Sequence, residues 1–155
     1  MRHRVWVLGA PDPEMEAIES LLREAGERVV YALTSDGRRV TAAEAYRMAP
    51  LSADATPWGG EVYLVECDTA EPWPQDAEGA PMPYRLVRRS DAPCEPGDPD
   101  DRDECYVRIR RIDHHRPGDP GYGRPPKEFM SASSIGQVVS VLAHRHLDHL
   151  RDRLA

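Results

Sequence analysis

Residues 5–33 contain an apolar run, a helical pattern and a second apolar run in close succession, and this order constrains the fold more than any other feature. The runs at 5–8 and 29–33 are short and rich in residues that favour buried strands. Between them, apolar residues recur at helical spacing over 15–25, and Gly26 ends the pattern. A strand, a helix and a strand within about thirty residues form a right-handed βαβ unit, so we predict an α/β fold with parallel strands.

Three later segments complete the predicted sheet and its covering. Apolar runs at 62–68 and 106–112 predict two more strands, and 84–88 is a candidate edge strand. An apolar stripe along 135–150 predicts a final helix that packs on the sheet. Because parallel sheets are usually covered on both faces, we predict a three-layer, Rossmann-like fold with a mainly parallel sheet and helices on both faces.

The length and charge of the chain limit its organisation and its partners. A chain of 155 residues is the size of one domain, so we expect a single domain over 1–155 with a long proline- and acid-rich loop at about 69–104. The net charge of -7 argues against binding to extended duplex nucleic acid or to anionic membranes. No apolar stretch is long enough to span a bilayer or to form a signal-peptide core, so we expect a cytoplasmic protein.

The cysteines, an acidic tract and the C-terminal histidines are weak candidates for a functional site. Three cysteines without CxxC spacing indicate neither disulfides nor structural zinc, and Cys67, after a buried strand, is predicted to be a core thiol. The acidic tract 99–104 lacks the spacing and the glycine of an EF-hand, so we interpret it as a solvated loop. Helical residues two apart point to nearly opposite sides, so His144 and His146 cannot share an ion, and only His146 with His149 could.

The segment Asp113-His114-His115 follows the predicted strand at 106–112 and carries three good metal ligands in a row. A carboxylate and two imidazoles suit Mn²⁺, Fe²⁺ or Zn²⁺ when other segments add carboxylates. The same segment is also typical of a polar turn, so its interpretation depends on its neighbours. Ligands of parallel α/β sheets bind at the carboxyl ends of the strands, where Asp12 and Asp68 follow two other predicted strands. We therefore predict a metal-binding edge.

The order of these motifs resembles that of the DHH phosphoesterase superfamily, which is named for its Asp-His-His triplet. The family has a first strand followed by a Pro-Asp-x-Asp segment, a later strand that ends on aspartate, the triplet, and a helix that starts with hydroxyl residues. The corresponding segments of this chain are Pro11-Asp12-Pro13-Glu14, Asp68, Asp113-His114-His115 and Ala132-Ser133-Ser134. The resemblance covers most of the chain outside its long loops, and it implies a DHH-like domain.

The resemblance also implies chemistry, namely two Mn²⁺ ions that activate a water for attack on phosphorus, with Mg²⁺ or another divalent ion as an alternative. It implies that His114 faces the scissile phosphate and acts in catalysis with Asp113. The metal ligands that it implies are Asp12, Glu14, Asp68, Asp113 and His115. Two features depart from the family: Leu8 or Gly9 stands where a histidine precedes the Pro-Asp step, and we expect the family's C-terminal substrate domain to be absent.

Five residues are candidates for substrate binding within this domain. Three are basic side chains near glycines, where side chains and backbone N–H groups can both approach a phosphate. Two are serines at a predicted helix start, where a phosphate can also bind. These candidates are Arg116, Arg124, Lys127, Ser133 and Ser134. The basic residues fit an ordinary solvated loop equally well, and the serines also fit simple helix caps.

Together these features predict a divalent-metal-dependent phosphoesterase or pyrophosphatase that acts on a small nucleotide-like substrate. The main alternative is a catalytically degenerate DHH-like module that binds a nucleotide or a protein partner, because the first motif is incomplete. A third interpretation is a Rossmann-like domain with an unrelated ligand, although the first strand-to-helix turn lacks GxGxxG. The identity of the substrate, the identity of the metal and the existence of a homodimer stay open.

Overall fold

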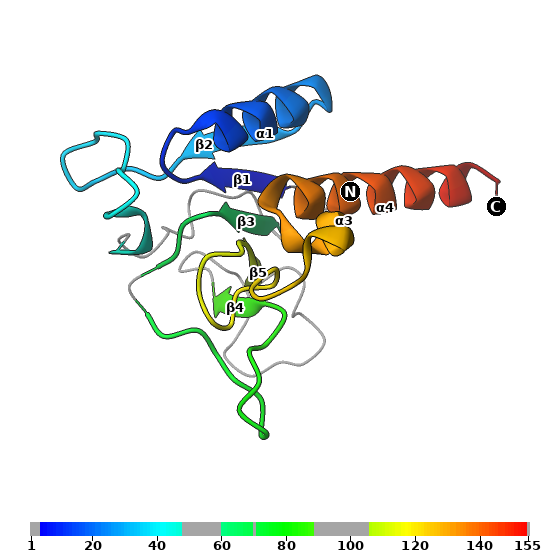
Figure 1. The fold of residues 1–155 in the computed structure, drawn as a ribbon. Coiled ribbons are helices and arrows are strands. Elements are labelled where there is room, and N and C mark those ends of the chain that lie inside the picture. Colours follow the sequence, from blue (N-terminus) through cyan, green and yellow to red (C-terminus); the bar gives the residue numbers. More distant parts are fainter. Residues whose placement is uncertain (1–3, 48–59, 70, 89–105, 155) are drawn as a thin grey trace.

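The computed structural model describes residues 4–47, 60–69, 71–88 and 106–154, and Figure 1 shows how their elements are arranged. Its five-stranded sheet has the order β2-β1-β3-β5-β4. The strands are β1 (Arg4–Leu8), β2 (Arg28–Tyr31), β3 (Glu61–Val65), β4 (Arg85–Arg88) and β5 (Tyr106–Ile112). Of these strands only β4, at the sheet edge, pairs antiparallel with its neighbour. The predicted α/β class with a mainly parallel sheet is therefore confirmed, as is the edge position of β4.

The predicted βαβ unit is present at the start of the chain. Helix α1 (Pro13–Glu24) connects β1 to β2, which pair in parallel from Val5 opposite Arg28 onward. Asp12 caps the helix by accepting a hydrogen bond from the N–H of Met15 (2.8 Å). Helix α1 therefore starts at the carboxyl end of β1, beside the turns that follow β3 and β5.

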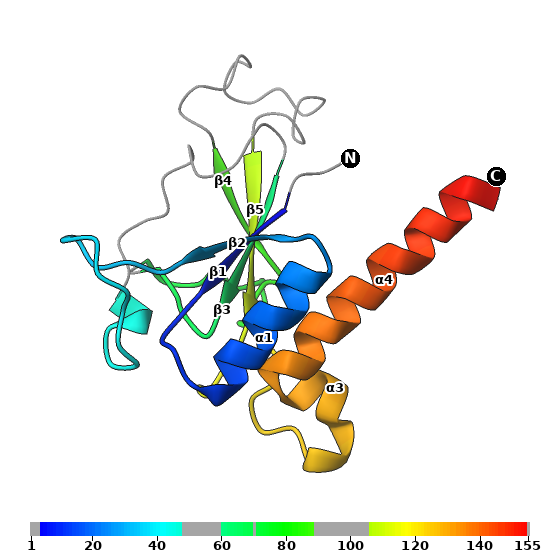
Figure 2. The ribbon, with the colours of Figure 1, turned by 90° about the horizontal axis from the view of Figure 1, so that it is seen from above.

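Both long helices lie on the same face of the sheet. Helix α4 (Ser134–Leu154) follows a short 3₁₀ turn, η3 (Pro126–Glu128), and the four-residue helix α3 (Phe129–Ala132), and it packs beside α1 (Figure 2). The core of this face includes Trp6 and Tyr63 of the sheet, whose rings stack with centroids 4.3 Å apart. Within the described part of the chain, no helix combines the length and the apolar character needed to cross a membrane.

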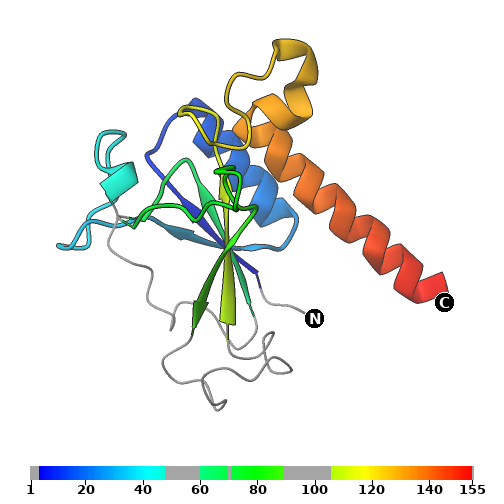
Figure 3. The ribbon, with the colours of Figure 1, turned by 90° about the horizontal axis from the view of Figure 1, so that it is seen from below.

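The opposite face of the sheet carries a second core under loops (Figure 3). It includes Val7, Leu64 and Ile109 from the strands, Ala45 from the 3₁₀ turn η1 (Ala45–Arg47), and the partly buried Trp73. Among the described residues no α-helix covers this face, so the predicted helices on both faces are not confirmed. The acidic tract 99–104 lies outside the described residues.

Candidate functional site

The turns after β1, β3 and β5 lie side by side at the carboxyl edge of the sheet. The N–H of Gly9 donates to the carbonyl of Val65 (2.9 Å), and the N–H of Glu66 donates to the carbonyl of Ile112 (2.9 Å). A Cβ on Gly9 would lie 2.3 Å from the carbonyl oxygen of Glu66, so only glycine allows this approach. The backbone thus brings together the strand ends that the sequence analysis predicts to converge.

Asp113 is buried at the centre of this edge, with 2% of its surface exposed. Its Oδ1 accepts hydrogen bonds from the N–H of His114 (2.7 Å), from the N–H of His115 (3.2 Å) and from Nδ1 of His115 (2.7 Å). Its Oδ2 accepts from the hydroxyl of Tyr46 (2.9 Å). Both oxygens are therefore engaged by the protein itself, and the carboxylate holds the histidine turn in place.

Glu66, His114 and His115 form a candidate metal cluster, a group whose ligand types and spacing could hold an ion. Each of the three offers one ligand atom, and these atoms lie within 4.8 Å of one another. The two imidazole rings stack with centroids 4.2 Å apart. Glu66 is 7% exposed, and its Oε1 is buried without a hydrogen-bond partner. A buried carboxylate oxygen without a donor requires an explanation, and a bound cation is one.

Glu66 is not among the residues predicted from the sequence. The pattern predicts a strand over 62–68, whereas β3 ends at Val65, so Glu66 belongs to the turn rather than to the strand. Its φ of 50° is in the left-handed region, which is uncommon for a residue with a side chain. An acid placed directly after a run of apolar residues is the signal that could have identified it.

The electrostatics of the cluster favour a cation. Burial raises the pKa of Glu66, as do the charges of Glu14 and Asp113, while Ser134 and His115 act in the opposite direction. Burial lowers the pKa of His115, but its hydrogen bond to Asp113 and the negative charge of that carboxylate outweigh burial and raise it. A cation beside these carboxylates would favour their charged forms and compensate their desolvation.

Asp68, a predicted ligand, lies at the same edge but is paired with arginines. Its Oδ2 is 3.4 Å from Arg111 and 3.1 Å from Arg116, and its Oδ1 accepts from the N–H of Thr69 (2.8 Å). The guanidinium of Arg116 also lies over the ring of Tyr46, with its central carbon 3.9 Å from the ring centroid. The structure therefore does not bring Asp68 into the candidate metal cluster.

The two acids of the first motif, Asp12 and Glu14, lie in different surroundings. Asp12 is exposed and serves as the cap of α1. Glu14 is partly buried, and its Oε1 accepts from the N–H of Ile135 (3.1 Å) at the start of α4. Glu14 therefore lies beside the start of α4, next to Ser134, whereas Asp12 makes its hydrogen bond within α1.

The predicted substrate-binding residues are dispersed. Ser133 caps α4 by accepting from the N–H of Gly136 (3.0 Å). Ser134 has no exposed surface, and its Oγ lies 3.2 Å from Nδ1 of His114. Arg124 pairs with Glu128 (3.2 Å), and the exposed Lys127 belongs to η3. Of the three basic candidates, Arg116 is the one whose contacts tie it to the strand ends.

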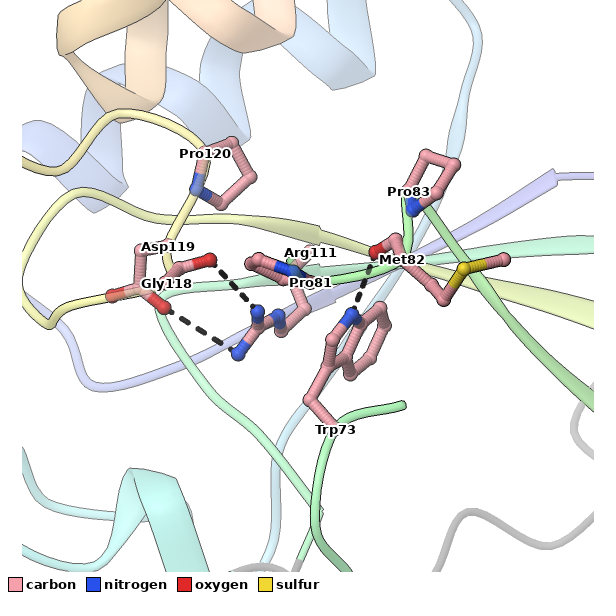
Figure 4. A pocket seen from close by; sticks show the side chains of 8 residues that line it. All are labelled: Trp73, Pro81, Met82, Pro83, Arg111, Gly118, Asp119 and Pro120. Carbon is pink, nitrogen blue, oxygen red and sulfur yellow. Dashed lines mark hydrogen bonds and ion pairs between the residues drawn. The ribbon is translucent and has the colours of Figure 1, made fainter. Parts of the chain in front are cut away.

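A pocket of about 270 Å³ adjoins this edge on the loop-covered face (Figure 4). Its lining residues are Trp73, Pro81, Met82, Pro83, Arg111, Gly118, Asp119 and Pro120. Arg111 lies between Asp119 (3.5 Å) and the Trp73 ring, whose centroid is 4.2 Å from the guanidinium carbon. Asp119 also accepts from the N–H of Arg116 (2.8 Å), so the pocket and the candidate metal cluster are linked through the 113–119 turn.

The remaining candidates lie away from the cluster. Cys67 is fully buried, its thiol donates to the carbonyl of Val7 (3.6 Å), and burial raises its pKa, all of which agree with a core thiol. His144 and His146 are exposed on α4 and form no metal-binding group with other described residues. The side chain of His149 is outside the described part.

Comparisons with protein-family models, with curated proteins and with solved structures gave no match. The functional assignment therefore depends on the residues at the carboxyl edge of the sheet. The strongest feature of that edge is the cluster of Glu66, His114 and His115.

Proposed function

We propose that the chain is a divalent-metal-dependent phosphoesterase or pyrophosphatase, with an ion held by Glu66, His114 and His115. The observation that carries the proposal is the approach of these three side chains around a buried Glu66 oxygen that has no donor. One carboxylate and two imidazoles suit Mn²⁺, Fe²⁺ or Zn²⁺. The resemblance of the Asp113-His114-His115 triplet to that of DHH phosphoesterases favours Mn²⁺ and hydrolysis at phosphorus.

The chain supplies groups for a phosphate beside such an ion. A divalent ion bound at the cluster would lower the pKa of a coordinated water and make it a nucleophile near neutral pH. The side chain of Arg116 is 40% exposed and lies against Tyr46, which bonds to Asp113. Its guanidinium is therefore placed to bind an anionic group next to the cluster.

The adjoining pocket suits a small group attached to that phosphate. Three prolines, Met82 and Trp73 give it mainly apolar walls, while Arg111 and Asp119 neutralise each other at its side. Its volume of about 270 Å³ lies just below the range usual for ligand sites, so it would take part of a substrate such as one base. This agrees with a nucleotide-like substrate and with a site too small for an extended duplex.

A binding module is the second candidate, and a specific observation favours it. The carboxylates expected to hold a second ion are engaged elsewhere, since Asp12 caps α1 and Asp68 pairs with two arginines. A single ion with Arg116 could recognise a phosphorylated ligand without turnover. For the fold we propose a DHH-like, Rossmann-like variant, supported by the parallel order β2-β1-β3-β5.

The first experiment measures metal binding by the purified chain. We expect Mn²⁺ or Zn²⁺ to bind stoichiometrically by calorimetry and to raise the melting temperature, since a ligand that binds only the folded state stabilises it. His115→Gln should lose this binding, whereas the matched variant His146→Gln, which alters an exposed histidine of α4, should keep it. Equal binding by both variants would place the ion elsewhere.

The second experiment separates the enzyme from the binding module. The metal-loaded chain is incubated with dinucleotides, cyclic nucleotides and pyrophosphate, and products are followed by chromatography and phosphate release. Hydrolysis that is lost in His115→Gln supports the phosphoesterase. If metal binds and the whole panel stays intact while a nucleotide still binds, the binding module is the correct function.

A further inference from the structure

We propose that Asp113 and Ser134 are positioning residues that hold His115 and His114 through their Nδ1 atoms, so that both histidines present Nε2 to the ion. This inference rests on the metal site proposed above and deepens it. It moves Asp113, which the family resemblance implies as a ligand, to a position behind the ligands. It also gives Ser134 a role in orienting a histidine rather than in contacting substrate.

The hydrogen bond between Asp113 and His115 determines where the imidazole proton lies. A carboxylate can only accept, so the Nδ1 of His115 at 2.7 Å from Oδ1 must carry the proton. In the neutral ring the lone pair is then on Nε2, which is the atom left for a metal. Metal-bound histidines commonly donate their second N–H to a carboxylate in this way.

The Asp113 carboxylate is itself fixed and is not free to bind an ion. Oδ1 already accepts from the N–H groups of His114 and His115 and from Nδ1 of His115, and Oδ2 accepts from the hydroxyl of Tyr46. With these four bonds and 2% exposure, Asp113 would have to leave its turn to become a ligand.

Ser134 holds the second histidine by the same principle. Its fully buried Oγ lies 3.2 Å from Nδ1 of His114. A hydroxyl oxygen can accept a hydrogen bond, and in the proposed tautomer the Nδ1–H of His114 donates to it. Both histidines would then have the same tautomer.

The position of Ser134 follows from the fold. It is the first residue of α4, and Glu14 of α1 accepts from the N–H of Ile135 (3.1 Å) next to it. Gln137, one turn further on, donates through its side-chain amide to the carbonyl of Asp113 (3.1 Å). These two hydrogen bonds hold the start of α4 against α1 and against the histidine turn, which keeps Ser134 next to His114.

The test reads the tautomers directly in the metal-free protein. With ¹⁵N-labelled histidine, long-range ¹H–¹⁵N correlation spectra distinguish Nδ1–H from Nε2–H rings, and His114→Gln and His115→Gln assign the signals. The spectra are recorded at a pH high enough for both rings to be neutral, and there we expect Nδ1–H for both residues. An Nε2–H tautomer at either residue would overturn the inference, and this reading needs no variant of Ser134 or Asp113 to fold.

Metal affinity provides the second reading. Loss of a group that orients a ligand typically lowers metal affinity by about 10- to 100-fold, so Ser134→Ala should weaken Mn²⁺ or Zn²⁺ binding by that factor. The spectra of Ser134→Ala should then show both tautomers of His114. The matched variant is Ser140→Ala on the same helix, where the hydroxyl donates to the carbonyl of Gly136 (3.0 Å). Equal affinity in the two variants would overturn the role of Ser134.

The outcomes distinguish this inference from the proposed function. If the wild-type chain binds no divalent ion, the proposed function fails and the inference fails with it. If the ion binds but the histidines have the other tautomer, only the inference fails. Wild-type ion binding, Nδ1–H rings and a selective effect of Ser134→Ala support both.

Discussion

Two buried acids at the carboxyl edge of the sheet, Glu66 and Asp68, have different partners. Glu66 lies among imidazoles, and its Oε1 has no donor. Asp68 lies only two residues further along and is held by Arg111 and Arg116. The two acids are almost equally buried, at 7% and 6% exposure. Burial therefore does not distinguish them, and the difference lies in their partners.

This difference indicates which acid can gain from a cation. The charge of Asp68 is already compensated by two guanidinium groups, so an added cation would be repelled by them. Glu66 instead has carboxylates and histidines as neighbours, and its raised pKa shows that its charge is poorly compensated. We expect ion binding at Glu66 and a structural ion-pair network, which borders the pocket, at Asp68.

The largest expected effect is the loss of ion binding in Glu66→Gln. The substitution keeps the shape of the side chain and removes its charge, so we expect Mn²⁺ or Zn²⁺ affinity to fall by more than about 100-fold, beyond what the loss of an orienting group costs. Isothermal titration measures the change. Asp68→Asn is the matched control and should keep wild-type affinity; a larger loss in Asp68→Asn would reverse the assignment of the two acids.

The next largest effect concerns the backbone contact that places Glu66. In Gly9→Ala the new Cβ would meet the carbonyl oxygen of Glu66 at 2.3 Å, and we expect the free energy of unfolding to drop by about 3 kcal/mol because backbone must shift. Denaturant titration measures it. Gly37→Ala is the control: its site has a positive φ of 83° but open space, so a loss of about 1 kcal/mol is expected. Similar losses in both variants would disprove the contact.

A smaller effect is expected from Asp68→Asn on stability. The amide keeps the hydrogen bond to Thr69 but removes the negative charge that pairs with Arg111, whose side chain is 9% exposed. Weakening a buried charged hydrogen bond costs about 1–2 kcal/mol, which chemical denaturation can detect. If the variant is as stable as the wild type, the arginines have found other partners and the network around Asp68 is dispensable.

The smallest effect is a pH dependence of the metal-free chain. Burial raises the pKa of Glu66, so the folded state binds its proton more tightly than the unfolded state does. The stability that this provides is present below the unfolded pKa and is lost as pH rises through the folded pKa. With a chelator present, the free energy of unfolding of Glu66→Gln should therefore equal that of the wild type at low pH and exceed it increasingly as pH rises.

The control for this pH series is the exposed Glu78, in the variant Glu78→Gln. The difference in free energy of unfolding between Glu78→Gln and the wild type should stay constant across the same pH range, because an exposed carboxylate is not destabilised by folding. Unfolding free energies at each pH provide the comparison. A constant difference for Glu66→Gln as well would mean that its carboxylate is not destabilised by its surroundings.

Local patterns predicted the strands of the sheet and the two long helices. The runs at 5–8 and 106–112 agree with β1 and β5, and Asp12 caps α1 as its position before Pro13 suggests. Strand ends and helix caps depend on residues close in sequence, so they can be predicted from the sequence. The covering of the second face was not predictable in this way, because the residues that pack there, such as Trp73, come from irregular segments without a period.

The sequence by itself determined that three acidic turns would meet at one edge, because parallel strands align their carboxyl ends. It did not determine which acids would be free to bind an ion. That depends on partners distant in the chain: Tyr46 engages Asp113 and Arg116 engages Asp68, while Ser134 lies behind His114. Hydrophobic periodicity determines where each residue lies along a strand or turn, but only tertiary packing determines the partners of its polar atoms. That packing leaves Oε1 of Glu66 without a hydrogen-bond donor.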